Sequence, residues 1–334
     1  MIRVKPIKNE IHFFFWVAVL LFCLPELGFS ASISVSGKVK KPLNLSMEEL
    51  RKMTPFHINN VTLLEEKKQP NDPEKLISVA SYKGVLLKDL LERAGMKYTR
   101  KFEPGVYIRV RGADGKESVF SFGEIFYSSI GRSTLLAYER DEKPVDPSGN
   151  NAELIVSTDI RAGRRIVNVK EILVKRVEVA LKAYEDRKKK ILRPPSSRLS
   201  FSDKTNNKFQ QVTLEDLRKL PSVYINDAVM IGDCEGFKGV YSFEGPTLRT
   251  VLEKFGVTAS EQNYNRFVLI SSDDGFCATF SLGEIFNSRL SDNIIIPYKK
   301  NGSLLKEDGF ARSVVREDST GGRSVQRIDQ IEII

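Results

Sequence analysis

The apolar and polar residues of this 334-residue chain follow two patterns, helical spacing and strand-like alternation. Apolar residues recur at helical spacing over residues 86–94, and Gly95 follows as a helix stop, so this stretch is predicted to be a helix. Over residues 106–111 apolar and basic side chains alternate, the chain turns at residues 112–115, and a second apolar stretch follows at residues 118–121. Alternation on both sides of a glycine-containing turn predicts a β-hairpin.

Further local signals complete the list of predicted elements. Ser46 and Thr213 each have an acidic residue three positions on, which is the pattern of a helix N-cap. Residues 167–177 alternate over part of their length and predict a closing strand. Strands with helices inserted between them, without regular β-α-β alternation, indicate the α+β class with mixed β-sheets.

The same segments return in the second part of the chain. Phe120-Ser-Phe-Gly-Glu-Ile-Phe126 recurs as Phe280-Ser-Leu-Gly-Glu-Ile-Phe286, with one difference in seven positions. Residues 45–53 match residues 212–220, residues 84–91 match residues 245–252, and Gly163-Arg164 matches Gly322-Arg323, always at an offset of about 159 to 167. We therefore predict two tandem domains, residues 33–177 and residues 198–334, joined by a linker at residues 178–197.

The N-terminus has the pattern of a secretory signal peptide over residues 1–30. Three basic residues precede an unbroken apolar stretch at Phe13–Leu24, and small residues follow, so cleavage is expected after Ser30. Twelve apolar residues are fewer than the roughly 20 needed to cross a bilayer, which leaves an uncleaved anchor as the alternative. We expect an exported protein, periplasmic or extracellular, with no membrane span after cleavage. No twin arginine precedes the apolar stretch.

The formal net charge of +9 favours anionic partners. Much of the surplus lies in the linker, at Arg187-Lys-Lys-Lys190 and Arg193, followed by Pro194-Pro195. Such a segment is typical of a solvated tether; a patch that binds phosphate or a membrane surface is the alternative. No aromatic residues are interleaved as they are at nucleic-acid surfaces, so we expect no nucleic acid partner.

Few cysteine and histidine side chains remain once the signal peptide is removed. They are Cys234, Cys277 and His57. A structural zinc site needs about four such ligands, and a c-type haem needs Cys-x-x-Cys-His, so both are excluded. No P-loop, nucleophile elbow or dinucleotide-binding glycine motif is present.

Several sequence segments, in their order along the chain, resemble those of a known family. They are Gly84-Val-Leu-Leu-Lys-Asp-Leu-Leu91, Tyr107-Ile-Arg-Val-Arg-Gly-Ala-Asp-Gly115, Leu136-Ala-Tyr-Glu-Arg-Asp-Glu-Lys-Pro-Val145 and Arg161-Ala-Gly-Arg-Arg165 with residues 169–174. Their order and spacing resemble the oxidoreductase molybdopterin-binding domain of the sulfite oxidase family. The first repeat matches best, and the second keeps the same skeleton in eroded form. The resemblance implies two tandem sulfite-oxidase-like domains of the α+β class.

The resemblance also implies a molybdopterin cofactor and a site for it. In that family the pterin dithiolene and one protein cysteine hold molybdenum, and a soft thiolate suits such a metal. Cys234, which precedes Gly245 in the family's position, would be the metal ligand and catalytic residue, whereas the first repeat has Glu66 there. Glycines, basic residues and a turn aspartate would bind the pterin and its phosphate. These candidates are Asp274, Gly321, Gly322, Arg323, Gly163, Arg164 and Arg165. Each taken alone could equally be a turn glycine or a solvated arginine.

Some family features are missing. Glu235, Gly236 and Phe237 follow Cys234, where sulfite oxidases have arginines that bind the substrate, and an acidic residue there would repel sulfite. The position of the family tyrosine falls near Lys116 or Phe276, so we expect a substrate other than sulfite. Cys234 has two alternative interpretations, a disulfide with Cys277 in an oxidising compartment and an ordinary buried side chain.

Two functions therefore follow from the sequence. The first is a molybdopterin-dependent oxidoreductase whose second repeat holds the cofactor and which passes electrons to a separate carrier, such as a cytochrome. The second is a binding or assembly module that kept the fold and lost the cofactor.

Overall fold

The computed structural model describes residues 32–67, 69, 71–96, 105–177, 196–232, 236–258 and 260–334. We call residues 32–177 the N-terminal half and residues 196–334 the C-terminal half. The predicted signal peptide at residues 1–30 and nearly all of the predicted linker lie outside the described residues. Ser32–Ile334 form one compact unit. Within the described part of the chain, no helix has the length and apolar character that a membrane span requires.

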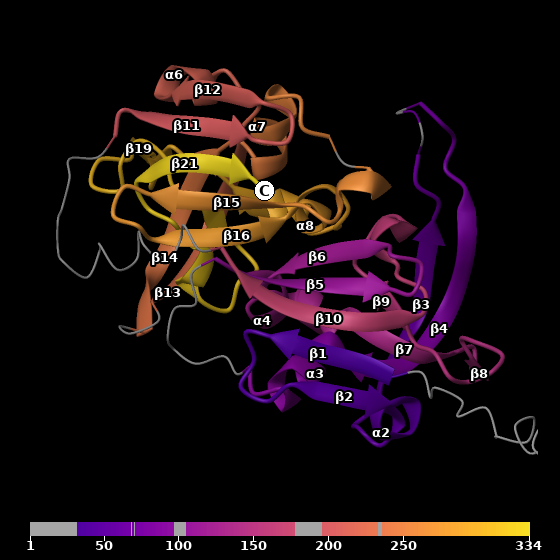
Figure 1. The fold of residues 1–334 in the computed structure, drawn as a ribbon. Helices are drawn as coiled ribbons and strands as arrows, with labels where there is room; N and C mark the ends of the chain where they lie inside the picture. The colour runs from indigo at the N-terminus through magenta and orange to yellow at the C-terminus, as the bar shows by residue number, and fades with distance from the viewer. Residues whose placement is uncertain are drawn as a thin grey trace, which may run out of the picture. The chain divides into compact units, whose positions relative to one another are not determined.

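Each half contains a five-stranded sheet, and the two sheets have corresponding strand orders (Figure 1). In the N-terminal half the order is β2 (Leu43–Ser46), β1 (Ser32–Gly37), β10 (Val169–Arg176), β5 (Val106–Gly112) and β6 (Glu117–Ser121). In the C-terminal half it is β12 (Lys208–Thr213), β11 (Arg198–Asp203), β21 (Ile328–Ile333), β15 (Phe267–Ser272) and β16 (Cys277–Ser281). β1 pairs in parallel with β10, as β11 does with β21, and the other pairs are antiparallel. The predicted mixed sheets are thus confirmed.

Each half also contains a second sheet built on a long hairpin. In the N-terminal half it contains β3 (Phe56–Leu64), β4 (Leu76–Leu86), β7 (Thr134–Arg140) and β8 (Lys143–Pro144), with β9 (Glu153–Val156) paired to β7. In the C-terminal half it contains β13 (Val223–Gly232), β14 (Gly236–Gly245), β18 (Lys299–Lys300) and β19 (Ser303–Leu304). A separate pair joins β17 (Ile294–Ile295) to β20 (Val314–Val315).

The described helices are short, the longest having seven residues. The α-helices are α2 (Met47–Arg51), α3 (Leu87–Arg93), α4 (Phe122–Phe126), α6 (Leu214–Arg218), α7 (Leu248–Lys254) and α8 (Leu282–Phe286). Single 3-10 turns are η1 (Ser129–Arg132), η2 (Ala162–Arg164), η3 (Glu261–Asn263), η4 (Ser291–Asn293) and η5 (Gly321–Arg323). The predicted caps are confirmed, because Ser46 and Thr213 both form capping boxes. The helix expected over residues 86–94 is α3, and Gly95 follows it with a φ of +85°.

Alternation along the strands places one core in each half. In β5 the side chains of Val106, Ile108 and Val110 are buried, while the residues between them are partly exposed. The fully buried Leu90 and Leu91 of α3 join the same core, and burial of each such side chain contributes roughly 1.5–3 kcal/mol. The C-terminal half has a separate core of the same kind.

The two halves pack against each other along β6 and β16 and along α4 and α8. The backbone N–H of Val119 donates to the carbonyl of Tyr264 over 2.9 Å. The hydroxyl of Thr279 donates to the carbonyl of Val106 over 2.8 Å. Both bonds run from one half to the other, and they frame the buried contact between α4 and α8.

Candidate functional site

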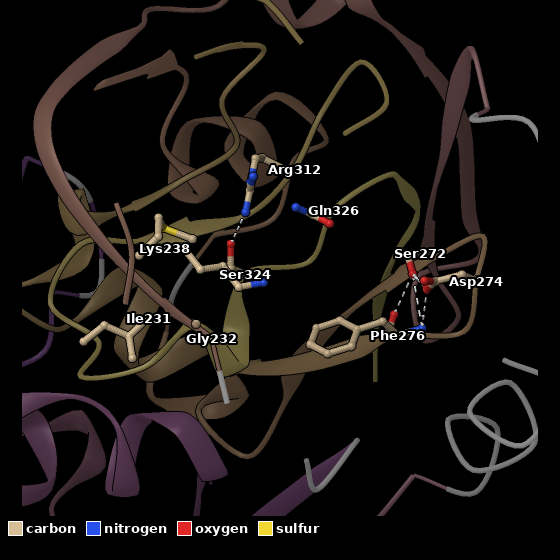
Figure 2. A pocket seen from close by; sticks show the side chains of 11 residues that line it. Ile231, Gly232, Lys238, Ser272, Asp274, Phe276, Arg312, Ser324 and Gln326 are labelled. Carbon is tan, nitrogen blue, oxygen red and sulfur yellow. Dashed lines mark hydrogen bonds between the residues drawn. The ribbon is translucent and has the colours of Figure 1, made fainter. Parts of the chain in front are cut away.

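A pocket of about 240 Å³ opens in the C-terminal half, and we call it the C-terminal pocket (Figure 2). Three segments that lie far apart in the sequence line it: the β13–β14 hairpin, the turn between β15 and β16, and the stretch from β20 to β21. Its lining residues are Met230, Ile231, Gly232, Lys238, Ser272, Asp274, Phe276, Arg312, Gly321, Ser324 and Gln326. Two of the predicted cofactor residues, Asp274 and Gly321, are therefore brought together here.

Cys234, the predicted metal ligand, lies outside the described residues, as do Asp233 and Glu235. Gly232 and Gly236, on either side of this gap, pair with each other across the hairpin, and Gly232 lines the pocket. Among the described residues there is no group of three or more His, Cys, Asp or Glu that could hold a metal ion. The role of Cys234 stays a prediction.

The turn between β15 and β16 holds Asp274 in place. Its carboxylate accepts a hydrogen bond from the backbone N–H of Phe276 over 2.9 Å and another from the hydroxyl of Ser272 (Figure 2). Gly275 supplies the positive φ of +82° that this tight turn needs. The carboxylate therefore closes the turn at the pocket wall.

Arg312 brings a buried guanidinium to the pocket, because its residue is only 3% exposed. Nη1 donates to Asp308 over 2.6 Å. Nη2 donates to the hydroxyl of Ser324 over 2.5 Å (Figure 2). Nε has no hydrogen-bond partner within the described residues. Burial lowers the pKa of Arg312, although Asp308 favours the charged form. Its Nε is a donor that a ligand could use.

Comparison of the two halves shows how this guanidinium could have been found in the sequence. At the offset of Gly163 and Gly322, Arg312 and Ser324 stand where the N-terminal half has Glu153 and Arg165. There Arg165 donates to Glu153 over 2.9 Å and 2.5 Å, which neutralises the buried carboxylate. The arginine of this pair therefore stands at the first position in the C-terminal half and at the second position in the N-terminal half. We did not single out Arg312 or Lys238 from the sequence, although this reversal of charge was visible in the repeat.

Arg164, predicted to bind phosphate, is fully buried among carboxylates. It donates to Asp159 over 2.8 Å from Nε and over 2.5 Å from Nη2, and its Nη1 donates to Glu124. Burial opposes the charged form of Arg164, but the two carboxylates outweigh this and raise its pKa. The guanidinium is neutralised inside the protein and does not line the C-terminal pocket.

Arg323 has the same environment in the C-terminal half. It donates to Asp318 over 2.8 Å and 2.6 Å and to Glu284 over 2.5 Å, and it is 3% exposed. Its neighbours Gly321 and Ser324 line the pocket, whereas Arg323 itself points to the contact between the halves. A phosphate could reach either arginine only by displacing its carboxylates.

The predicted glycines have different surroundings. A Cβ on Gly163 would lie 2.2 Å from Oε1 of Glu66 and 2.2 Å from the ring of Tyr264. A Cβ on Gly322 would lie 2.6 Å from the ring of Tyr127. Both glycines therefore allow close packing. Glu66 of the N-terminal half and Tyr264 of the C-terminal half lie directly against the Gly163 segment, which corresponds to a wall of the C-terminal pocket.

Cys277 is buried in the contact between the halves, at 1% exposure. It packs with Leu269 and Val177, whereas the preceding Phe276 faces the C-terminal pocket. Burial raises the pKa of its thiol to about 12, so the thiolate is disfavoured. Pairing with Cys234 stays untested, but Cys277 faces away from the pocket.

Comparison with known proteins places part of this architecture in a family. Residues 29–156 match the model of the oxidoreductase molybdopterin-binding domain. This segment belongs to that family. The resemblance stated from the sequence is thereby confirmed for residues 29–156. The match ends at Val156, before the C-terminal half begins. Two tandem molybdopterin-binding domains stay a prediction.

Two further comparisons add less. The crystal structure of the sulfane dehydrogenase SoxCD from Paracoccus pantotrophus is similar, with 12% identity over 90% of this chain and 77% of that chain and a TM-score of 0.34. At this level the likeness says nothing about the activity of this chain. Among curated proteins no match was found.

Proposed function

We propose that this chain is an exported oxidoreductase-like protein that holds a molybdopterin cofactor in the C-terminal pocket, with Cys234 as the metal ligand. The proposal includes two tandem molybdopterin-binding domains, of which the second would be the working one. The single observation that supports it most directly is that Gly232, Asp274 and Gly321 line the same pocket. Cys234 follows Gly232 by two positions in the sequence, so we expect its thiolate to serve the same ligand as the turn and the glycine segment.

The chemistry of the pocket residues fits such a group. Lys238 and Arg312 provide cations for a phosphate, and the side chains of Ser272, Ser324 and Gln326 provide polar groups for a pterin. The volume of about 240 Å³ lies just below the roughly 300–1,000 Å³ typical of small-molecule sites.

When bound, a molybdenum–pterin group would supply two-electron oxygen-atom transfer. The residues of this chain would bind and orient it. Arg312 is held by Asp308 and Ser324, so its Nε has a defined position at the pocket wall. Phe276 presents an apolar ring to the pocket and would help to exclude water. Electrons would leave through a separate carrier, such as a cytochrome, because the chain has no haem motif.

Metal analysis tests this function. The protein would be purified from an exporting host that makes the cofactor, and molybdenum and pterin would be measured per chain. We expect about one molybdenum per chain in the wild type and a loss of at least 10-fold in Cys234→Ser, because a hydroxyl is a much poorer ligand than a thiolate. Cys277→Ser is the matched control and should keep the metal, since Cys277 faces away from the pocket.

A cofactor-free binding or assembly module is the second candidate. The neutralised Arg164 and Arg323 favour it, because the arginines expected at a phosphate are already paired with carboxylates. Only traces of molybdenum in wild-type protein, despite a supply of cofactor, would support this module and contradict the oxidoreductase.

Export is part of the same proposal and has its own test. The basic residues before Phe13–Leu24 and the small residues near Ser30 support cleavage by a signal peptidase. N-terminal sequencing of the protein from its native host should find a mature chain that begins near Ala31. An intact Phe13–Leu24 segment in the membrane fraction would contradict export as a soluble protein.

A further inference from the structure

The most strongly repeated segments of the chain form a buried cluster between the two halves. Its charged members, which we call the interface cluster, are Glu124, Asp159 and Arg164 from the N-terminal half and Glu284, Asp318 and Arg323 from the C-terminal half. The side chains of all six are at most 3% exposed. The cluster is separate from the C-terminal pocket, and nothing in the proposed function uses its charges.

Two serines join the halves of this cluster reciprocally. The hydroxyl of Ser121 donates to Glu284 over 2.7 Å, and the hydroxyl of Ser281 donates to Glu124 over 2.8 Å. The backbone N–H of Ser121 also donates to Glu124 over 3.2 Å, and that of Ser281 donates to Glu284 over 2.8 Å. Each serine therefore contacts both glutamates, and the two carboxylates lie close together across the interface.

The charges of the interface cluster do not balance. If all six side chains were ionised, four carboxylates would face two guanidiniums, and an excess of two negative charges would be buried. An uncompensated buried charge is costly, and such groups bind protons instead. Both arginines stay charged, because the carboxylates raise the pKa of Arg164 and of Arg323 despite burial. The excess must then be relieved at the carboxylates.

Glu124 is one of the carboxylates on which this effect acts. Burial raises its pKa to about 7, Arg164 opposes the rise, and the charge of Glu284 adds to it. Burial also raises the pKa of Asp159 and of Asp318. Glu124 and Glu284 share their serine partners, so the charge of Glu284 acts on Glu124 at short range.

Among the described residues, the cations that pair with Glu124 and Glu284 are Arg164 and Arg323. The other polar and charged groups near the interface cluster are Asn287, which donates to Asp159, and Arg289, Glu317 and Tyr264, which act on its two aspartates from farther away. Arg289 also donates to the carbonyl of Ser157 over 3.2 Å. The interface cluster therefore depends on protons for its balance.

We propose that the contact between the halves is a proton-dependent lock. A proton held by the Glu124–Glu284 pair keeps α4 and α8 together, and loss of that proton at higher pH loosens the contact. Gly321 and Ser324 flank Arg323 and line the C-terminal pocket, so loosening would also reach the pocket wall. The lock does not depend on which ligand the pocket takes.

Linkage sets the direction of the pH dependence. The folded-state pKa of Glu124 is about 7, above its ordinary value of 4.5. Between these pH values, the closed state, in which α4 and α8 are in contact, therefore binds more protons than the open state, in which this contact is lost. Stability therefore falls as pH rises through that window, and the loss is complete above about pH 7. A carboxylate that is simply paired with an arginine would show the opposite dependence.

Cys277 is a reporter of this contact, because it lines a small cavity together with Gly123 and Arg323. The full chain would be labelled with an alkylating reagent at pH 4.5 to 8, and the peptide containing Cys277 would be quantified by mass spectrometry. Dividing each rate by the rate in denatured protein at the same pH removes the intrinsic ionisation of the thiol. We expect the protection to fall by up to roughly 10-fold per pH unit between about pH 5 and 7.

Glu124→Gln is the decisive variant, because glutamine keeps the shape and removes the charge. Its protection should be nearly independent of pH in that window, and Glu284→Gln tests the same pair from the other half if the first variant does not fold. Glu49→Gln is the matched control, because Glu49 has the same capping-box role in α2 but is exposed and has no opposing carboxylate. It should keep the wild-type slope.

The outcomes separate clearly. A slope in the wild type that disappears in either glutamine variant of the pair supports the lock. A wild-type protection that is flat between pH 5 and 7, or a slope that persists in every folded variant of the pair, overturns it. Neither result depends on molybdenum content, so the lock and the proposed cofactor can fail independently.

Discussion

At the scale of single residues, Gly123 and Gly283 are the positions that most restrict substitution at the interface. A Cβ on Gly123 would lie 2.2 Å from Cδ of Arg323, and a Cβ on Gly283 would lie 2.1 Å from Cδ of Arg164. Glycine-to-alanine changes in helices normally gain up to about 1 kcal/mol, but overpacking a buried site costs roughly 1–3 kcal/mol. We therefore expect Gly123→Ala and Gly283→Ala each to lower the free energy of unfolding by about 2 kcal/mol in urea titrations. A stabilised Gly123→Ala protein would contradict the close contact with Arg323.

At the scale of elements, the capping boxes of α2 and α4 look alike in sequence but differ in what they hold. Ser46 caps α2 together with the exposed Glu49, whereas Ser121 caps α4 and also donates to Glu284 in the other half. Ser46→Ala should cost about 1 kcal/mol, the usual value of an N-cap. Ser121→Ala should cost about 2–3 kcal/mol, because it also leaves a buried carboxylate without one donor. Equal losses in denaturant unfolding would show that the bond to Glu284 contributes little.

At the scale of the whole molecule, the buried interface cluster should make the two halves unfold together. The hydroxyl groups of Ser121 and Ser281 each find their acceptor in the opposite half. We expect scanning calorimetry near pH 5.5, where the cluster holds its proton, to show one transition whose calorimetric and van't Hoff enthalpies agree. Two resolved transitions under these conditions would mean that the halves are independent domains.

Local patterns were sufficient to predict the elements. The helix at residues 86–94, the caps at Ser46 and Thr213 and the hairpin after Val106 follow from side-chain spacing and turn chemistry, which act over a few residues. The mixed sheets and the match of residues 29–156 to a molybdopterin-binding domain were also within reach. The repeat was visible in the sequence as well. The roles of the repeated residues were not, because sequence identity does not show which side chains are in contact.

The sequence by itself determined the α+β elements, the duplicated order of segments and the family of the N-terminal half, because these depend on spacing along the chain. Only the tertiary structure decided the roles of the repeated residues. Arg164 and Arg323 had the pattern of a phosphate site, and the fold places them against carboxylates. Arg312 had no motif, and the fold brings it to the C-terminal pocket. Charge, burial and partners depend on contacts between residues that lie 5 positions apart in one case and 163 in another, and such contacts exist only once the chain has folded.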